Sequence, residues 1–140
     1  MTKQTFEIID GVYSGPEAWD GDLDLRDYKD TLTSLGSLKE VRGWTYLEDC
    51  TSLTSLGSLT KVGGWLQLRG CTSLVSLGSL KEVRYGLFLG DENISLQEVQ
   101  EKISYYSSLP LHEVMNALHM YEVQSVPLYK NILLQTLQGG

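Results

Sequence analysis

The sequence predicts an α+β fold, in which a solenoid with a short-stranded parallel sheet is capped by a C-terminal helical segment. The segment Leu53–Val62 recurs 21 residues later as Leu74–Val83, and a related segment, Leu32–Val41, stands 21 residues earlier. Apolar residues alternate with period two before the repeated segments, whereas helical spacing begins only near residue 95. A fixed period of this length is typical of stacked units that cannot bury their apolar faces alone.

The strand of one repeat is predicted at Trp65–Arg69, after a glycine turn at residues 63–64. Leu66 and Leu68 are expected to face the core, and the three residues that alternate with them face outward. The following apolar residues recur at every third position, which indicates a 3₁₀ or polyproline-like return arm rather than a regular α-helix. They are Leu74, Leu77, Leu80 and Val83.

The pattern Leu66-x-Leu68-x-x-Cys71-x-x-Leu74-x-x-Leu77 resembles the leucine-rich repeat family, whose consensus has an L-x-L strand, then Asn or Cys, then spaced leucines. The resemblance covers about residues 22–89. It implies a right-handed solenoid whose concave sheet face binds partners. The short unit without a helix looks closer to the repeats of bacterial and phage proteins than to the longer helical kind.

Three regions follow from these patterns: an N-terminal cap over 1–21, the solenoid over 22–93 and a helical cap over 94–140. Phe6–Ile8 is expected to add a strand at the first end. Terminal repeats need such cover, because their apolar ends would otherwise aggregate.

The helical cap is predicted to contain two or three short helices. Ser95 and Glu98 form a capping box at the start of the first helix, while Pro110 and Pro127 can each open another. On the second helix the spacing places four apolar residues on one packed face. They are Leu111, Val114, Met115 and Leu118.

The outward strand positions are the candidate partner-binding residues: Trp44, Tyr46, Glu48, Trp65, Gln67, Arg69 and Phe88. Trp44 and Trp65 occupy the same repeat position, so their rings should be neighbours. Tryptophan and tyrosine bury a large area at low entropic cost, and both are enriched at interface hot spots. Two alternatives remain: the cap or a loop covers the rings, or they form cross-strand pairs with no partner.

The net charge is −7, and residues 1–30 contribute −5 of it, from eight acids and three bases. Five of these acids form a predicted acidic patch: Asp20, Asp22, Asp24, Asp27 and Asp30. Such a charge disfavours direct nucleic-acid binding and favours a basic protein partner, for example one with a nucleic-acid-binding cleft. Solubility and the blocking of a sheet end are the alternative explanation.

Cys50 and Cys71 share a repeat position and should be neighbours on stacked strands, which lie ~4.8 Å apart. A disulfide is compatible with that distance. Parallel side chains rarely give the required dihedral angle, so two buried thiols are favoured.

The sequence favours neither a metal site nor an enzyme, and no cofactor is expected. The run Asp20–Asp24 resembles the start of a calcium loop, but Leu25 and Thr31 stand where such a loop needs glycine and glutamate. His112 and His119 lack a third ligand nearby in the sequence. No nucleophile elbow or phosphate-binding glycine loop is present.

The expected function is that of a non-catalytic protein-binding module that acts by occlusion. No apolar stretch is long enough for a signal sequence or a membrane span, so we expect a soluble cytoplasmic protein without membrane contact. The resemblance to phage-type repeats suggests a phage-encoded inhibitor of a bacterial defence system, similar in role to anti-CRISPR proteins. The alternative is an assembly protein that self-associates, as a homodimer, through its helical cap.

Overall fold

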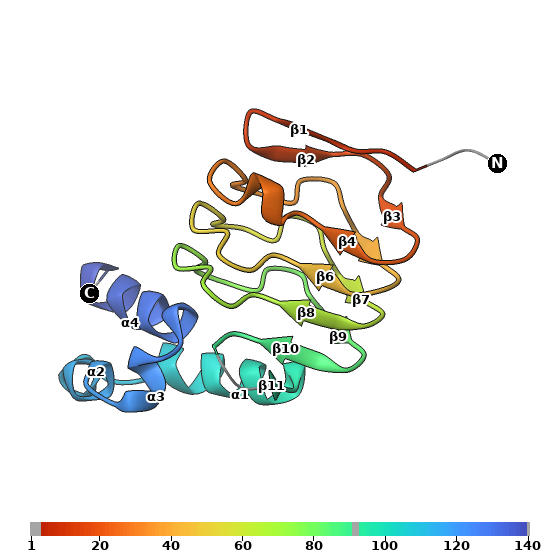
Figure 1. Ribbon diagram of the computed structural model, residues 1–140. Helices are drawn as coiled ribbons and strands as arrows, with labels where there is room; N and C mark the ends of the chain where they lie inside the picture. Colours follow the sequence, from red (N-terminus) through yellow and green to blue (C-terminus); the bar gives the residue numbers. More distant parts are fainter. Residues whose placement is uncertain (1–3, 91–92, 140) are drawn as a thin grey trace.

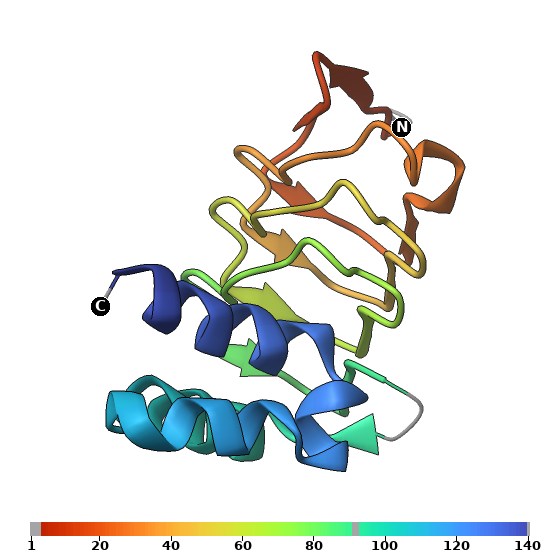
Figure 2. The same ribbon diagram turned by 90° about the vertical axis from the view of Figure 1, so that its left-hand side faces the viewer.

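The helices cap one end of a solenoid in the computed structural model, which describes residues 4–90 and 93–139. About three turns of the chain stack as a solenoid, with parallel strands on its sides (Figure 1). The N-terminal hairpin lies at one end of the stack and the helices lie at the other (Figures 1 and 2). The expected α+β solenoid with a helical end is therefore present.

Two parallel ladders run along the stack, and each coil contributes one short strand to each of them. The first sheet has the order β11-β10-β8-β6-β4 and the second has the order β3-β5-β7-β9. The first comprises β4 (Leu23–Asp24), β6 (Thr45–Tyr46), β8 (Trp65–Gln67), β10 (Gly86–Phe88) and the antiparallel β11 (Asn93–Ile94). The second comprises β3 (Ala18–Trp19), β5 (Glu40–Val41), β7 (Lys61–Val62) and β9 (Glu82–Val83).

The second sheet corrects the prediction of a continuous 3₁₀ or polyproline-like return arm. Val41, Val62 and Val83 end the three arms, and they pair in register across β5, β7 and β9. Each strand is two residues long, too short to show an alternating pattern in the sequence. Strands therefore support each coil on two of its sides.

The third side of each coil is built by the repeated Ser-Leu-Gly segment. The hydroxyl oxygens of Ser34, Ser55 and Ser76 accept hydrogen bonds at 2.9–3.1 Å from the backbone N–H two residues ahead. That N–H belongs to a glycine with φ between 55° and 59°, a left-handed conformation that favours glycine. A Cβ atom on Gly57 would also lie 2.6 Å from the backbone of Gly36, so the coils stack closely here.

The core is a set of aligned leucine columns between these three sides. Leu66 and Leu68 are buried as predicted, and so are the leucines of all three return arms. Cys50 and Cys71 are both buried free thiols, and the Cys71 Sγ lies 3.1 Å from the Leu47 carbonyl oxygen. A buried leucine contributes about 1.5–3 kcal/mol to folding, so the columns supply a large part of the driving force.

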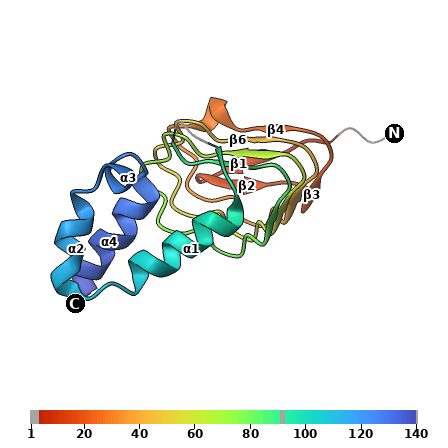
Figure 3. The ribbon, with the colours of Figure 1, turned by 90° about the horizontal axis from the view of Figure 1, so that it is seen from below.

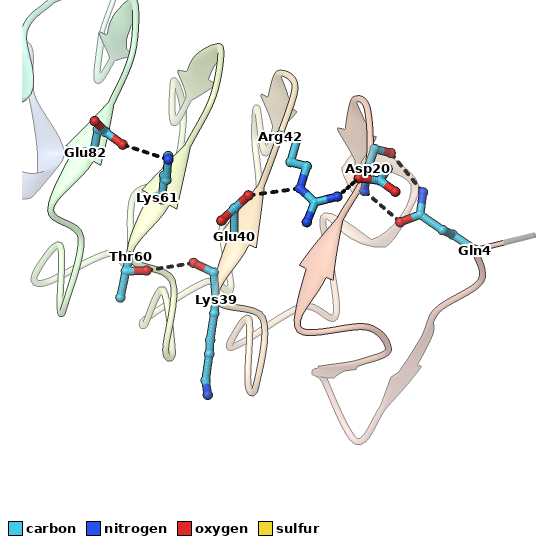
Figure 4. A network of polar contacts seen from close by, with 8 residues as sticks. All are labelled: Gln4, Asp20, Lys39, Glu40, Arg42, Thr60, Lys61 and Glu82. Atoms are coloured by element: carbon cyan, nitrogen blue, oxygen red, sulfur yellow. Dashed lines mark hydrogen bonds and ion pairs between the residues drawn. The ribbon is translucent and has the colours of Figure 1, made fainter.

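The N-terminal end is covered by an antiparallel hairpin of β1 (Glu7–Ile9) and β2 (Val12–Ser14). The expected strand at Phe6–Ile8 is thus present, shifted by one residue. Val12 bridges to Ser34, and Gln4 exchanges two hydrogen bonds with the backbone of Asp20 at 2.7 and 2.9 Å (Figure 4). These contacts hold the hairpin segment on the first coil.

The outer surface of the second sheet carries alternating charges. Arg42 pairs with Asp20 on the preceding coil and with Glu40 of β5 on its own coil, while Lys61 lies 3.4 Å from Glu82 on the next coil (Figure 4). Exposed pairs of this kind contribute little to stability individually. They cover this side with paired polar groups, which distinguishes it from the aromatic surface described below.

The C-terminal end consists of four helices in the described part of the chain, one more than the upper expectation. They are α1 (Leu96–Ser107), α2 (Leu111–Leu118), α3 (Tyr121–Gln124) and α4 (Pro127–Gly139). The Ser95 hydroxyl accepts a hydrogen bond from the Glu98 N–H at 3.2 Å, as the capping box predicts. No helix among residues 4–90 and 93–139 has the length and hydrophobicity needed to cross a bilayer.

The packed face of α2 differs from the prediction. Val114 and Leu118 are buried, but Leu111 and Met115 are 53% and 52% exposed. The spacing i, i+4 allows these two side chains to share a surface stripe that α4 does not cover. Asn131 on α4 fixes the helices to the third coil, because its Nδ2 donates to the carbonyl oxygens of Thr72 and Leu74 at 2.9 Å.

Candidate functional site

The parallel register of the first sheet brings the predicted outward residues together in columns. Tyr46, Gln67 and Phe88 are direct partners across β6, β8 and β10. Thr45, Leu66 and Leu87 form the neighbouring inward column and are fully buried. The alternation predicted from the sequence therefore places the aromatic residues on the outer side of the sheet.

Five rings on this side form one connected surface, the aromatic face, consisting of Trp44, Tyr46, Trp65, Tyr85 and Phe88. Trp44 contacts Tyr46 and Trp65, with ring centroids 6.0 and 6.3 Å apart. Trp65 also contacts Tyr85 at 6.0 Å and Phe88 at 5.3 Å. These separations are typical of favourable aromatic pairs, so the rings support one another without a partner.

The aromatic face is open to solvent. Trp44 is 39% exposed and Tyr85 is 52% exposed, while the other three rings are half-buried. Seen from below, the helices extend away from the side of the stack on which β4 and β6 lie (Figure 3). Cover by the helical cap, one of the alternatives considered above, does not occur at Trp44.

Tyr85 is the ring that the sequence prediction missed. The pairs Gly43–Trp44 and Gly64–Trp65 are inverted in the last coil, where Tyr85 precedes Gly86. A Cβ atom on Gly86 would lie 2.5 Å from the Asn93 side chain, so β11 leaves no room for a larger residue there. The inverted order within the repeat was the available signal, because it moves the ring by one position.

A charged cluster borders the rings on the N-terminal side. The Arg26 guanidinium carbon lies 4.8 Å from the Tyr46 ring centroid, and Arg26 forms two hydrogen bonds with Asp24 at 2.9 and 2.7 Å. Glu48 approaches the same guanidinium at 3.7 Å. The Arg26 hydrogen bond lowers the pKa of the Asp24 carboxyl group, so this carboxylate stays ionised at neutral pH.

The predicted acidic patch is exposed but divided between the two ends of β4. Asp20 and Asp22 lie in the bend before β4, where the Asp22 carboxylate accepts a hydrogen bond from the Trp44 N–H at 2.8 Å. Asp27 belongs to the 3₁₀ turn Arg26–Tyr28, and Asp30 follows this turn. Negative charge therefore flanks the aromatic face along its first strand rather than forming one compact cluster.

Gln67 and Arg69 extend the outward positions of β8. Gln67 is half-buried between Tyr46 and Phe88 in its column, and Arg69 is exposed. Arg69 also lines a cleft of about 770 Å³ between the end of the first sheet and the helices. The cleft contains the ion pair between Lys102 and Glu122, so part of its charge is already compensated within the chain.

Comparisons with known proteins give no relative from which a function can be transferred. No protein-family model matches the chain, and neither the curated proteins nor the solved structures yield a match.

Proposed function

We propose that this chain is a non-catalytic protein-binding module that docks on its partner through the aromatic face. The observation that carries the proposal is the connected, solvent-exposed set of rings around Trp44 and Trp65. Large aromatic side chains held rigid by their neighbours lose little entropy on binding and bury a large area. Glu48 and Arg69 at the border can add charge recognition.

The proposed mechanism is occlusion of a surface on the partner. A sheet face supported by a packed leucine core is rigid, which suits docking without rearrangement. The resemblance to short leucine-rich repeats of phage proteins supports a specialised form of this role, inhibition of a bacterial defence system. The acidic patch around β4 would attract a target with a basic surface.

Affinity capture from a bacterial lysate tests the proposal. The tagged wild-type chain is compared with Trp44→Ala plus Trp65→Ala, and both are checked for folding by circular dichroism. The matched control is Tyr105→Ala plus Tyr121→Ala, which removes two rings of the helical cap that are 58% and 85% exposed. A protein retained by the wild type and the control but lost by the tryptophan variant supports the proposal. Equal retention by all three contradicts it.

One observation favours a second candidate, self-association through the helical cap. In the described part of the chain, most of the large apolar side chains with high exposure lie in the helical cap: Tyr105, Leu111, Met115, Met120, Tyr121 and Leu134. Exposed apolar groups gathered in one region are typical of interaction surfaces. Sedimentation velocity over a concentration series tests this candidate, with Leu111→Glu plus Met115→Glu as the disrupting variant. A monomer at all concentrations contradicts it.

A further inference from the structure

We infer that the aromatic face recognises an arginine side chain of its partner, at the position that Arg26 fills in the free protein. This inference rests on the proposed function, because it names the chemistry of the partner that the same face binds. The partner would carry an arginine-rich segment, and its guanidinium group would replace that of Arg26 on Tyr46.

The surroundings of Arg26 contain all the groups that bind a guanidinium. The Tyr46 ring lies beneath it at 4.8 Å, Asp24 accepts two hydrogen bonds from Nε and Nη2, and Glu48 lies 3.7 Å from Nη1. A ring face attracts a cation, and a carboxylate matches the planar fork of a guanidinium with two parallel hydrogen bonds. A lysine ammonium group lacks this fork, so the site should select arginine.

Arg26 is held on Tyr46 by exposed contacts, so an arginine of the partner can replace it. The side chains of Arg26 and Asp24 are 46% and 48% exposed, and exposed ion pairs contribute little to stability because water screens them. A partner that brings several contacts to Trp44 and Trp65 can therefore displace Arg26 at low cost. After displacement, Asp24 and Glu48 both face the incoming cation.

The other end of the aromatic face holds a second contact between a guanidinium group and a ring. The Arg84 guanidinium carbon lies 5.4 Å from the Tyr85 ring centroid. Between Arg26 and Arg84 lie Trp44 and Trp65, over which an extended cationic segment could pass. The negative charge of residues 1–30 also attracts such a segment, and this attraction should weaken as salt is added.

Fluorescence anisotropy with labelled peptides tests the inference. The probes are a peptide of alternating arginine and glycine, its lysine counterpart and its glutamate counterpart, each measured at low and at moderate salt. The variant is Arg26→Ala, which empties the position on Tyr46. The matched control is Arg42→Ala, which removes the same charge from the second sheet, where Arg42 pairs with Asp20 and Glu40. Circular dichroism confirms that each variant is folded.

The wild type should bind the arginine peptide more tightly than the lysine peptide and should not bind the glutamate peptide. Arg26→Ala should tighten binding of the arginine peptide by about two- to fivefold, because the peptide then no longer has to displace Arg26 from Tyr46 and Asp24. Arg42→Ala should change it by less than about twofold, because Arg42 pairs with Asp20 and Glu40 rather than with a ring and its exposed charge is screened. Adding Tyr46→Leu to Arg26→Ala should remove the gain.

Two results overturn the inference. The first is equal or weaker arginine-peptide binding by Arg26→Ala, which would show that Arg26 does not compete with the peptide for the position on Tyr46. The second is no arginine-peptide binding by wild type or variant. If lysate capture still depends on Trp44 and Trp65 in either case, the proposed function stands and only the arginine assignment fails. If capture is indifferent to these tryptophans, the proposed function fails as well.

Discussion

The indole rings of Trp44 and Trp65 meet edge to face on adjacent coils, with centroids 6.3 Å apart and planes inclined at 71°. The two residues are 21 positions apart in the sequence and occupy equivalent places in the repeat. The solenoid therefore converts a sequence period into a spatial contact. The tryptophan contact joins Tyr46 on one side to Tyr85 and Phe88 on the other.

A double-mutant cycle on Trp44 and Trp65 should measure how strongly these rings support each other. Trp44→Ala should lower the free energy of unfolding by about 1 kcal/mol and Trp65→Ala by about 2 kcal/mol, because Trp65 touches three other rings and Trp44 touches two. Urea unfolding of the single and double variants provides the values. A double variant that does not fold would show that the rings belong to the core.

The close stacking of the coils should make Gly57 intolerant of substitution. Gly57 and Gly21 both have positive φ, 59° and 78°, but a Cβ atom on Gly57 would meet the Gly36 backbone whereas Gly21 faces open space. Gly21→Ala should cost about 1 kcal/mol from the backbone conformation alone. Gly57→Ala should cost about 2 kcal/mol more, because the coils must separate. Equal losses in chemical denaturation would disprove close stacking at this position.

Asn131 should be the main polar link between the helices and the solenoid. Asn131→Ala removes two hydrogen bonds to carbonyl groups of the third coil and should cost about 1–3 kcal/mol. Limited proteolysis should then cut the helical cap faster than in the wild type. Asn116→Ala, on the exposed surface of α2, is the matched control and should leave the cleavage rate unchanged. Equal rates for both variants would show that apolar packing alone holds the cap.

The buried thiols should make the protein less stable at alkaline pH. Burial raises the pKa of Cys50 to about 11 and that of Cys71 to about 12, from an ordinary value of 9.0. The unfolded chain therefore releases these protons above pH 9 while the folded chain retains them, so stability is full below pH 9 and falls as the pH rises further. The melting temperature, recorded from pH 8 upward, should follow this course.

Cys50→Ala plus Cys71→Ala should make this alkaline decline shallower. A residual slope is expected, because burial also raises the pKa of Tyr106 to about 12 and raises those of Tyr13 and Tyr129. In the wild type, a thiol reagent at pH 8 should react slowly before unfolding and quickly after it. Fast reaction of the folded protein would contradict the burial of both thiols.

Much of the solenoid was predictable because one repeat shows both the alternating strand and the spaced leucines. The Leu66 and Leu68 pattern gave the inward side of the sheet, and the matching positions of Trp44 and Trp65 gave the ring contact. The Ser95 capping box gave the start of α1. Each of these predictions depends on a local pattern that repeats or has a fixed spacing.

Features that depend on contacts between coils were harder to predict. The second sheet consists of two-residue strands, which can be recognised as strands only from their pairing with adjacent coils. Tyr85 joined the rings because β11 restricts Gly86, a contact that lies outside the repeat. Leu111 and Met115 have helical spacing with Val114 and Leu118, but the direction from which α4 packs decides which of them are buried.

The most direct test of the central claim is the tryptophan emission of the protein when the captured partner is added. Trp19→Phe leaves Trp44 and Trp65 as the two remaining tryptophans, both on the aromatic face. A face that docks should show a blue-shifted emission and reduced acrylamide quenching once the complex forms. Unchanged emission and quenching in a complex shown by sedimentation to be fully formed would place the binding surface elsewhere.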